Sequence, residues 1–201
     1  MDPTRRSFFQ LGFGSLALAA CARRLAATPY IADDDPPPTC GETTAANIEG
    51  PFYKAGAPHR AVLVSARDEG ERLSIAGVVR AQDCKPIAGA AMEIWHADAR
   101  GAYDNDGFHF RGTLVTDARG RFELRSIVPG RYLNGDRFRP AHVHVKLHAR
   151  GHRALTTQLY FDGDPYNDGD PFIVPSLIMA HRKDGGVRRA SFDFVLAPAS
   201  G

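Results

Sequence analysis

A pair of histidines separated by one residue is the clearest chemical feature of this sequence. His142 and His144 lie in a run where Val143, Val145 and Leu147 alternate with polar side chains. Side chains of a strand alternate between its two faces, so we expect the aliphatic residues in a core and both histidines on the opposite face. Two imidazoles roughly 7 Å apart along a strand can converge on one ion, which makes a metal half-site. A polar face open to water is the alternative.

The elements that carry this pair are expected to be short strands. The chain has 201 residues with 20 Gly and 14 Pro, which fits one turn-rich domain with an N-terminal extension. No sustained 3.6-residue periodicity appears, apart from a turn or two of helix near 172–180. We therefore predict an all-β fold, a single β-sandwich of about eight short strands. The expected strands are Arg60–Ser65, Arg72–Arg80, Ala91–His96, Gly112–Thr116, Arg121–Ile127, His142–Leu147, Ala154–Phe161 and Arg189–Leu196.

The N-terminus is typical of an export signal. Arg5 and Arg6 precede an uncharged stretch, 11–20, that is shorter than the roughly 20 apolar residues a membrane-spanning helix needs. Paired arginines before such a stretch resemble a twin-arginine signal, so we assign 1–21 to export and expect a periplasmic or extracellular protein. Residues 18–21 also resemble a lipobox, with a lipid anchor on Cys21; cleavage farther on, without an anchor, is the alternative. Residues 22–39 are expected to be a flexible linker arm, and 40–201 the domain.

The cysteine count and the net charge bear on the expected disulfide and on the expected partners. If Cys21 is used in processing, Cys40 and Cys84 remain as an even pair in an oxidising compartment, either joined by a disulfide or as two free thiols. The net charge is +2 and no basic stripe with interleaved aromatic residues appears, so a nucleic-acid partner has no support.

Motifs spread over residues 40–196 resemble one enzyme family. Arg139-Pro140-Ala141-His142-Val143-His144 is similar to the signature of the intradiol ring-cleavage dioxygenases, which include protocatechuate 3,4-dioxygenase and catechol 1,2-dioxygenase. Four more segments match in order: 49–53 (EGPFY), 93–104 (EIWHADARGAYD), 127–132 (IVPGRY) and 157–165 (TQLYFDGDP). The resemblance implies a β-sandwich that holds ferric iron, Fe(3+), through two tyrosines and two histidines. Carried over by position, the ligands are Tyr103, Tyr132, His142 and His144.

The chemistry of these donors agrees with that resemblance. A phenol has a pKa near 10, so tyrosine is a good ligand only for a hard, highly charged cation such as ferric iron. The implied reaction is intradiol cleavage of a small aromatic diol by O2 to a muconate-type diacid. In this reaction Tyr132 leaves the iron and accepts a substrate proton. Arg139 is expected to stabilise charge that develops on the ring, and Gln158 to line the same pocket.

Other assignments stay open at this point. Segments around Pro129-Gly130-Arg131-Tyr132 also resemble transthyretin-like binding sandwiches, in which the tyrosine is a structural corner residue and no catalysis occurs. Asp104 could instead complete a ferrous site with two histidines and one carboxylate. The acidic loop 162–170 lacks EF-hand spacing and is expected to make turns. The assembly is also open, with a homo-oligomer among the alternatives.

Overall fold

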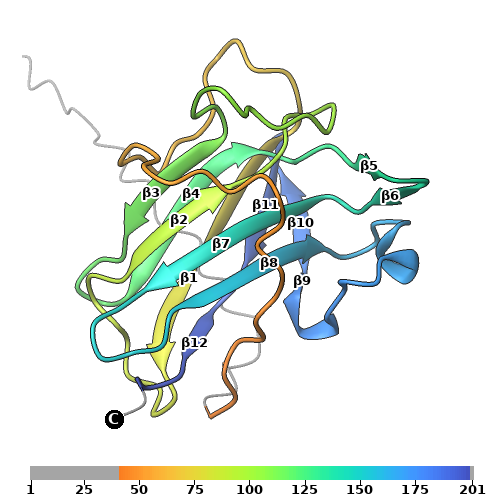
Figure 1. Ribbon diagram of the computed structural model, residues 1–201. Coiled ribbons are helices and arrows are strands. Elements are labelled where there is room, and N and C mark those ends of the chain that lie inside the picture. The colour runs from red at the N-terminus through yellow and green to blue at the C-terminus, as the bar shows by residue number, and fades with distance from the viewer. Residues whose placement is uncertain (1–40, 200–201) are drawn as a thin grey trace, which may run out of the picture.

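Two five-stranded sheets and a small hairpin make up the part of the chain that the computed structural model describes, residues 41–199 (Figure 1). One sheet has the order β10 (His181–Asp184), β11 (Val187–Ser191), β1 (Arg72–Ala81) and β12 (Phe194–Leu196), with β4 (Arg121–Ile127) also paired to β1. The second has the order β3 (Arg111–Val115), β2 (Ala91–Trp95), β7 (His142–His148), β8 (Leu155–Phe161) and β9 (Ile178–Met179). The hairpin pairs β5 (Tyr132–Asn134) with β6 (Arg137–Arg139), and 3-10 turns occupy Asn167–Gly169 and Pro175–Leu177. The predicted all-β sandwich is confirmed.

The core between the sheets is built from alternate strand residues. In β7, Val143, Val145 and Leu147 are completely buried, as their spacing predicts. They meet aliphatic side chains from both sheets, and burying each such side chain contributes about 1.5–3 kcal/mol. Members of this cluster from β1, β2 and β4 include Leu73, Ile75, Val79, Met92, Ile94 and Leu124.

The outer face of the second sheet is covered by the first described segment, residues 44–53, which crosses it as an extended arm (Figure 1). Asn47 N donates to Thr156 O at 2.9 Å, and Thr157 Oγ1 donates to Ala45 O at 2.8 Å. The arm closes the outer side of β7 at its first residues, so His142 and His144 are only 2% and 1% exposed. The alternative of a histidine pair facing water is therefore wrong.

The expected strand Arg60–Ser65 is wrong in detail. The segment is extended, but it makes only isolated bridges, His59 to Thr113 and Val62 to Arg125. Thr113 belongs to β3 and Arg125 to β4, so the segment crosses from the edge of one sheet to the other. An alternating pattern predicts extended backbone, but it does not predict whether another strand pairs with that backbone.

The last expected strand, Arg189–Leu196, is two strands, with a break at Phe192 and Asp193. Gly77 of β1 explains the break, because a Cβ at that position would lie 1.9 Å from the carbonyl oxygen of Phe192. Asp193 then accepts a hydrogen bond from Val78 N at 2.8 Å in place of a ladder bond. Four short strands, β5, β6, β9 and β10, were not expected, and the helical turn expected near 172–180 is the 3-10 turn Pro175–Leu177 followed by β9.

Several predictions fall on residues outside 41–199. The export signal 1–21, the linker 22–39, Cys21 and Cys40 all lie outside the described residues. Cys84 is disulfide-bonded, but the pairing with Cys40 stays a prediction for the same reason. Within residues 41–199, no helix combines the length and the apolar character needed to cross a membrane.

Candidate functional site

The floor of the candidate site is the outer face of the second sheet. The strand register places Trp95, His144 and Gln158 side by side on β2, β7 and β8. In the next row His142 lies opposite Tyr160. Cross-strand partners share a face of a sheet, so these five side chains point to one side, under the covering arm. The predicted histidine pair and the predicted Gln158 are thus brought together.

Tyr103 meets both histidines from the loop that follows β2. Its hydroxyl oxygen lies 3.3 Å from Nε2 of His142 and 3.0 Å from Nε2 of His144. Metal bonds of about 2.0–2.2 Å put two ligand atoms at right angles about 3 Å apart, so this spacing suits three donors to one ion. Nδ1 of His142 donates to the carbonyl oxygen of Pro140 at 2.7 Å, which leaves its Nε2 lone pair free to bind a metal. Within residues 41–199, Nδ1 of His144 is buried without a hydrogen-bond partner.

Two glycines fix the distance between the loops that carry Tyr103 and Tyr132. Gly130 N donates to Asp98 O at 2.7 Å, which joins the two loops backbone to backbone. A Cβ on Gly101 would lie 2.2 Å from the carbonyl oxygen of the residue before Tyr132, and a Cβ on Gly130 would lie 2.4 Å from Gly101 N. Only residues without a side chain permit this crossing, so the separation of the two tyrosines is set by backbone packing.

Aromatic rings enclose the donor atoms. Phe52 stacks on Tyr103 with ring centroids 4.2 Å apart, and Trp95 stacks on His144 at 4.7 Å. The ring of Tyr132 lies 5.7 Å from Tyr103 and edge-on to it, and it lies 5.7 Å from the imidazole of His142. The structure therefore brings the rings of all four predicted ligand residues into one cluster, with Phe52 and Trp95 packed against it.

Burial sets the protonation of these groups. It lowers the pKa of His142 to about 3, with the nearby Arg139 guanidinium as a second cause, and it lowers the pKa of His144 well below its usual value. Both imidazoles are therefore neutral, which is the form that binds metals. Burial, and then the neighbouring Tyr132, raise the pKa of Tyr103. Without a cation that phenol keeps its proton, so a phenolate here requires a strong positive charge beside it.

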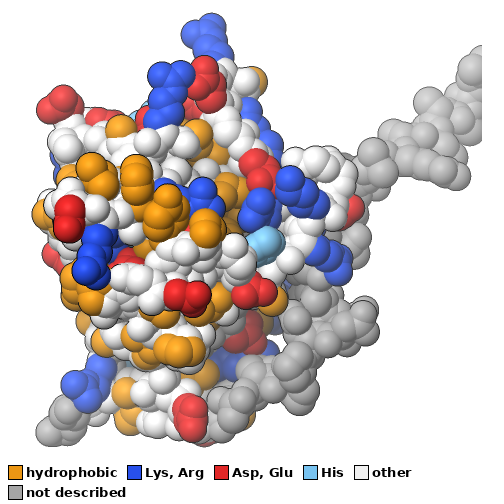
Figure 2. Space-filling view, turned by 90° about the vertical axis from the view of Figure 1, so that its right-hand side faces the viewer, with side chains coloured by type: hydrophobic (Ala, Val, Ile, Leu, Met, Phe, Trp, Pro, Cys, Tyr) orange, Lys and Arg blue, Asp and Glu red, His pale blue; other side chains and the backbone are white. Residues whose placement is uncertain are grey.

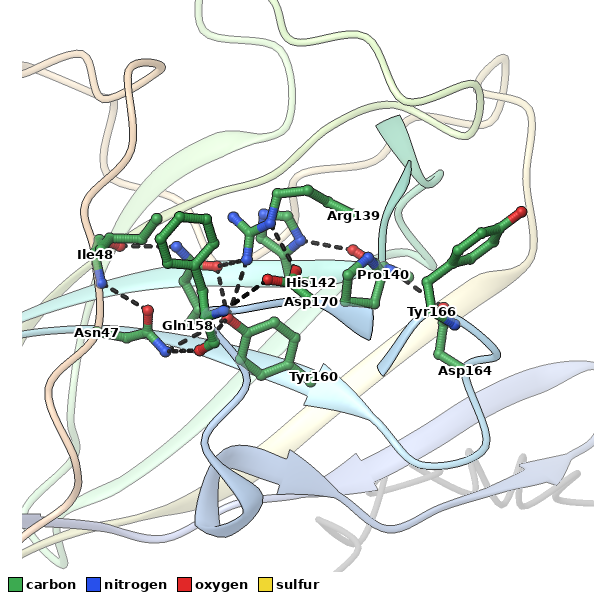
Figure 3. Close-up of polar contacts among 12 residues, drawn as sticks. Asn47, Ile48, Arg139, Pro140, His142, Gln158, Tyr160, Asp164, Tyr166 and Asp170 are labelled. Carbon is green, nitrogen blue, oxygen red and sulfur yellow. Dashed lines mark hydrogen bonds and ion pairs between the residues drawn. The ribbon is translucent and has the colours of Figure 1, made fainter. Parts of the chain in front are cut away.

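Arg139 lies in a buried network at the edge of the histidines (Figure 3). Its Nε donates to Asp170 Oδ2 at 2.7 Å, and the two side chains are only 4% and 1% exposed. One terminal nitrogen donates to Gln158 Oε1 at 3.0 Å and to the hydroxyl of Tyr160 at 3.2 Å. The guanidinium also lies over the ring of Phe172, 4.8 Å from its centroid. Burial alone would lower the pKa of Arg139, but its hydrogen bonds to Asp170 and to Tyr132 outweigh burial and raise it.

Gln158 connects this network to the covering arm. Besides the bond from Arg139, its Oε1 accepts the hydroxyl of Tyr160 at 3.0 Å, while its Nε2 donates to Ile48 O at 2.8 Å. Asn47 of the same arm donates to Phe172 O at 2.8 Å (Figure 3). The amide of Gln158 is thus fixed at both ends, and in this arrangement it orients the Arg139 guanidinium.

The alternative ligand Asp104 faces away from the histidines. Its carboxylate accepts the backbone N–H groups of Asp106, Gly107 and His109 at 3.1, 2.7 and 2.8 Å. Over residues 41–199, no group of three or more His, Cys, Asp or Glu side chains could hold a metal ion. A site of two histidines and one carboxylate is therefore not formed there, and the acidic loop 162–170 forms no calcium cluster.

Some residues of the site were not predicted from the sequence. Trp95 and Tyr160 carry a signal that could have revealed them, because the period of two in strands puts Tyr160 on the face of Gln158. Asp170 and Phe172 come from a loop that has no periodicity. Phe52, like Trp95 and Tyr160, lies within a motif that matches the family, but its stacking on Tyr103 has no sequence signature.

Comparison with known proteins adds a second kind of observation. Residues 48–198 match the sequence profile of the family described as Dioxygenase. A chlorocatechol 1,2-dioxygenase of Pseudomonas sp. strain P51 is 33% identical over 177 residues, covering 76% of this chain and 70% of that protein. One from Rhodococcus opacus is 37% identical over 156 residues, covering 65% of this chain and 61% of that protein. The fold is similar to the dioxygenase domain of a dioxygenase and carbohydrate-binding fusion protein from Streptomyces sp. SirexAA-E, with a TM-score of 0.74, 44% identity, 79% of this chain covered and 100% of that chain covered.

Proposed function

The chain belongs to the intradiol dioxygenase family, and on that premise we propose that it opens catechol-type rings between the two hydroxyl-bearing carbons. O2 is the co-substrate and a muconate-type diacid the product. The observation that carries this proposal is the contact of the Tyr103 hydroxyl with Nε2 of both His142 and His144. The match spans 61–70% of the two relatives named above, and the catechol-type substrate is proposed for this chain on the geometry of its own site.

The donor set fits ferric iron. We propose Tyr103, Tyr132, His142 and His144 as its ligands, because two phenolates favour a hard cation and offset most of a +3 charge. The raised pKa of Tyr103 is consistent with this, since its phenolate needs a strong positive charge beside it. Ferric iron held there would be chelated by the diol as its dianion, and electron donation from the ring toward the iron would make a ring carbon reactive toward O2.

Tyr132 is proposed as the proton acceptor for the diol. It lies at the start of β5, on a hairpin rather than on the floor, and its ring faces both Tyr103 and His142. Arg139 is its cross-strand partner in the β5–β6 ladder, so a fixed positive charge lies on the adjacent strand. A positioned general base contributes about 10²–10⁴-fold to a rate.

Arg139 is proposed to stabilise negative charge that develops on the ring. A buried cation held in place needs no reorganisation during the reaction, and this makes its field effective. Asp170 neutralises Arg139 in the resting site, so the burial of the cation is tolerated. Gln158 and Tyr160 then fix the direction in which the guanidinium points.

The decisive experiment is oxygen uptake by iron-loaded protein with a panel of substituted catechols and no added reductant. We expect one O2 consumed per ring-opened diacid, with both oxygen atoms found in the product, and no uptake by metal-free protein. Cleavage beside the diol would contradict the proposal. Tight binding across the panel without oxygen uptake would instead support the transthyretin-like alternative.

A further inference from the structure

One buried carboxylate lies beside the candidate site without facing it. Asp164 belongs to the loop after β8 and is 8% exposed. Its two oxygens accept Nε of Arg131 at 3.1 and 3.0 Å, and Oδ2 also accepts Ala141 N at 3.1 Å. Oδ1 also accepts a hydrogen bond from Tyr166 N at 3.0 Å, and both residues are labelled in Figure 3. One carboxylate thus joins three separate segments of the chain.

Two of these segments carry proposed ligands. Arg131 directly precedes Tyr132, and Ala141 directly precedes His142. We propose that Asp164 is a positioning residue that sets the spacing between Tyr132 and His142, and through it the proton transfer from the diol. This inference rests on the proposed function, although Asp164 itself touches neither the diol nor the proposed ligand side chains.

Asp164 attaches the Tyr132 side of the hairpin, whereas Arg139 attaches the other strand to the floor. β5 and β6 have three residues each, and among the strands of residues 41–199 they pair only with one another. Side chains in the middle of the hairpin are exposed, so little apolar packing holds it to the body. A misplacement of about 1 Å can cost on the order of 10²-fold in rate. The double bond from Arg131 to Asp164 supplies a fixed point one residue before Tyr132.

Asp164→Asn is the nearest change that weakens this attachment. The shape is kept, but one carboxylate oxygen becomes an NH2 group, which donates and faces an existing N–H donor. The Arg131 guanidinium also loses its opposite charge. The Arg131 side chain is 45% exposed, so it can turn to water and the fold is expected to persist. Asp162→Asn, two residues earlier on an exposed side chain of the same loop, is the matched control.

Iron content, the tyrosinate-to-iron charge-transfer band, and kcat and KM for oxygen uptake should be measured on wild type and both variants. For Asp164→Asn we expect unchanged iron content, a shifted band, kcat lowered by about 10–100-fold and KM within about 2-fold. In metal-free protein, amide hydrogen exchange at Ala141 should be faster than in wild type. Asp162→Asn should match wild type throughout.

Arg131→Gln provides a second test if Asp164→Asn folds poorly. It releases only the Tyr132 side, so the band should shift and kcat should fall while the Ala141 amide keeps its protection. Wild-type band and kcat in Asp164→Asn, or in Arg131→Gln where the first variant is unfolded, overturn this inference alone. A wild-type protein that binds no iron and consumes no O2 overturns the proposed function and, with it, this inference.

Discussion

The site has two halves, a floor and a hairpin, that are built in opposite ways. The floor is formed by β7 between β2 and β8, and its His142 and His144 are buried beneath an arm of the chain. The β5–β6 hairpin lies at the side of the molecule that Figure 2 shows, where hydrophobic and charged side chains mix on the surface. There Leu133 and Phe138 are 57% and 46% exposed.

This difference matches the role in the reaction that is proposed for each half. The two histidines, proposed to stay bound throughout the reaction, lie on a sheet whose neighbours fix their rotamers, and Tyr103 is held by stacking on Phe52. Tyr132, which is proposed to exchange a metal bond for a substrate proton, belongs on an element with freedom to move. The two halves meet at Arg139, which is on the hairpin but bonded to Gln158 of the floor.

Removing a floor ligand should have the largest effect. His144→Ala deletes a proposed donor that no neighbouring side chain replaces. Loss of a group that merely supports a ligand costs about 10–100-fold in metal affinity, so we expect a larger loss of iron, with colour and oxygen uptake lost together. Metal analysis and visible absorption check this. His148→Ala, on the exposed end of the same strand face, is the control, and equal iron in both variants would refute the assignment of His144.

Removing the hairpin tyrosine should spare the metal. Tyr132→Phe leaves Tyr103, His142 and His144, so iron should be largely retained, while loss of the base lowers kcat by about 10²–10⁴-fold. Tyr103→Phe should reduce iron, colour and turnover together. Stopped-flow spectra after catechol addition distinguish the two variants. A Tyr132→Phe enzyme with the normal spectral change and rate would make Tyr132 a structural corner residue.

Acid should destabilise the floor through His96. This residue follows β2, and its ring nitrogens bond to Ser126 Oγ of β4 at 2.6 Å and to Ala97 O at 2.7 Å, so it bridges the two sheets. Burial lowers its pKa from 6.5 to about 4. Below pH 6.5 the unfolded chain takes up the proton first, so the contribution of His96 to the free energy of unfolding should fall by about 3 kcal/mol between pH 6.5 and 4 and level off below.

Urea unfolding across this pH range measures that effect. His96→Gln should be less stable at pH 7 but should lose this part of the pH slope, whereas His148→Gln should keep the wild-type slope. An unchanged slope in His96→Gln would show that other groups control acid unfolding.

Surface changes on the hairpin should have the smallest effect. Leu133→Ser alters a side chain that is 57% exposed, so the free energy of unfolding should change by less than about 0.5 kcal/mol. Oxygen-uptake kcat should stay within about 2-fold. Thermal unfolding checks the first value. A loss above 2 kcal/mol would mean that the hairpin is packed as tightly as the floor.

The sequence predicts the floor better than the hairpin, for a physical reason. Alternation along β7 is local information, so the core face and the histidine face follow from the pattern alone. The hairpin strands are too short to show alternation, although Asn134-Gly135 is a hairpin signal that could have revealed the turn. The place of Asp164 could not be predicted, because its partners are 33 and 23 residues away and no pattern links them.

The expected ligand set came from resemblance rather than from spacing. Tyr103 lies in a loop and Tyr132 at the first residue of the short strand β5, where the position of a side chain depends on tertiary packing such as the crossing of Gly101 and Gly130. The structure brings both tyrosines to the histidines, but whether they bind iron stays a prediction. Asp104 is the opposite case. Its position next to Tyr103 in the sequence allowed a ligand role, but in the structure its carboxylate accepts hydrogen bonds from the backbone N–H groups of Gly107 and His109 instead.

The position of β1 in the first sheet also governs when the domain can fold during synthesis. Val78 and Asp193, bonded across this sheet, are 115 residues apart in the sequence. At about 5–20 residues per second, a ribosome needs roughly 6–23 s to make the stretch between them. Once β4 has been made, β1 can pair with it on one side, but its other hydrogen-bonding edge stays open until β11 and β12 follow, and an open edge is a template for aggregation. Native folding must therefore follow the synthesis of residues 187–196, and a protein that holds β1 during this interval should raise the yield of folded enzyme.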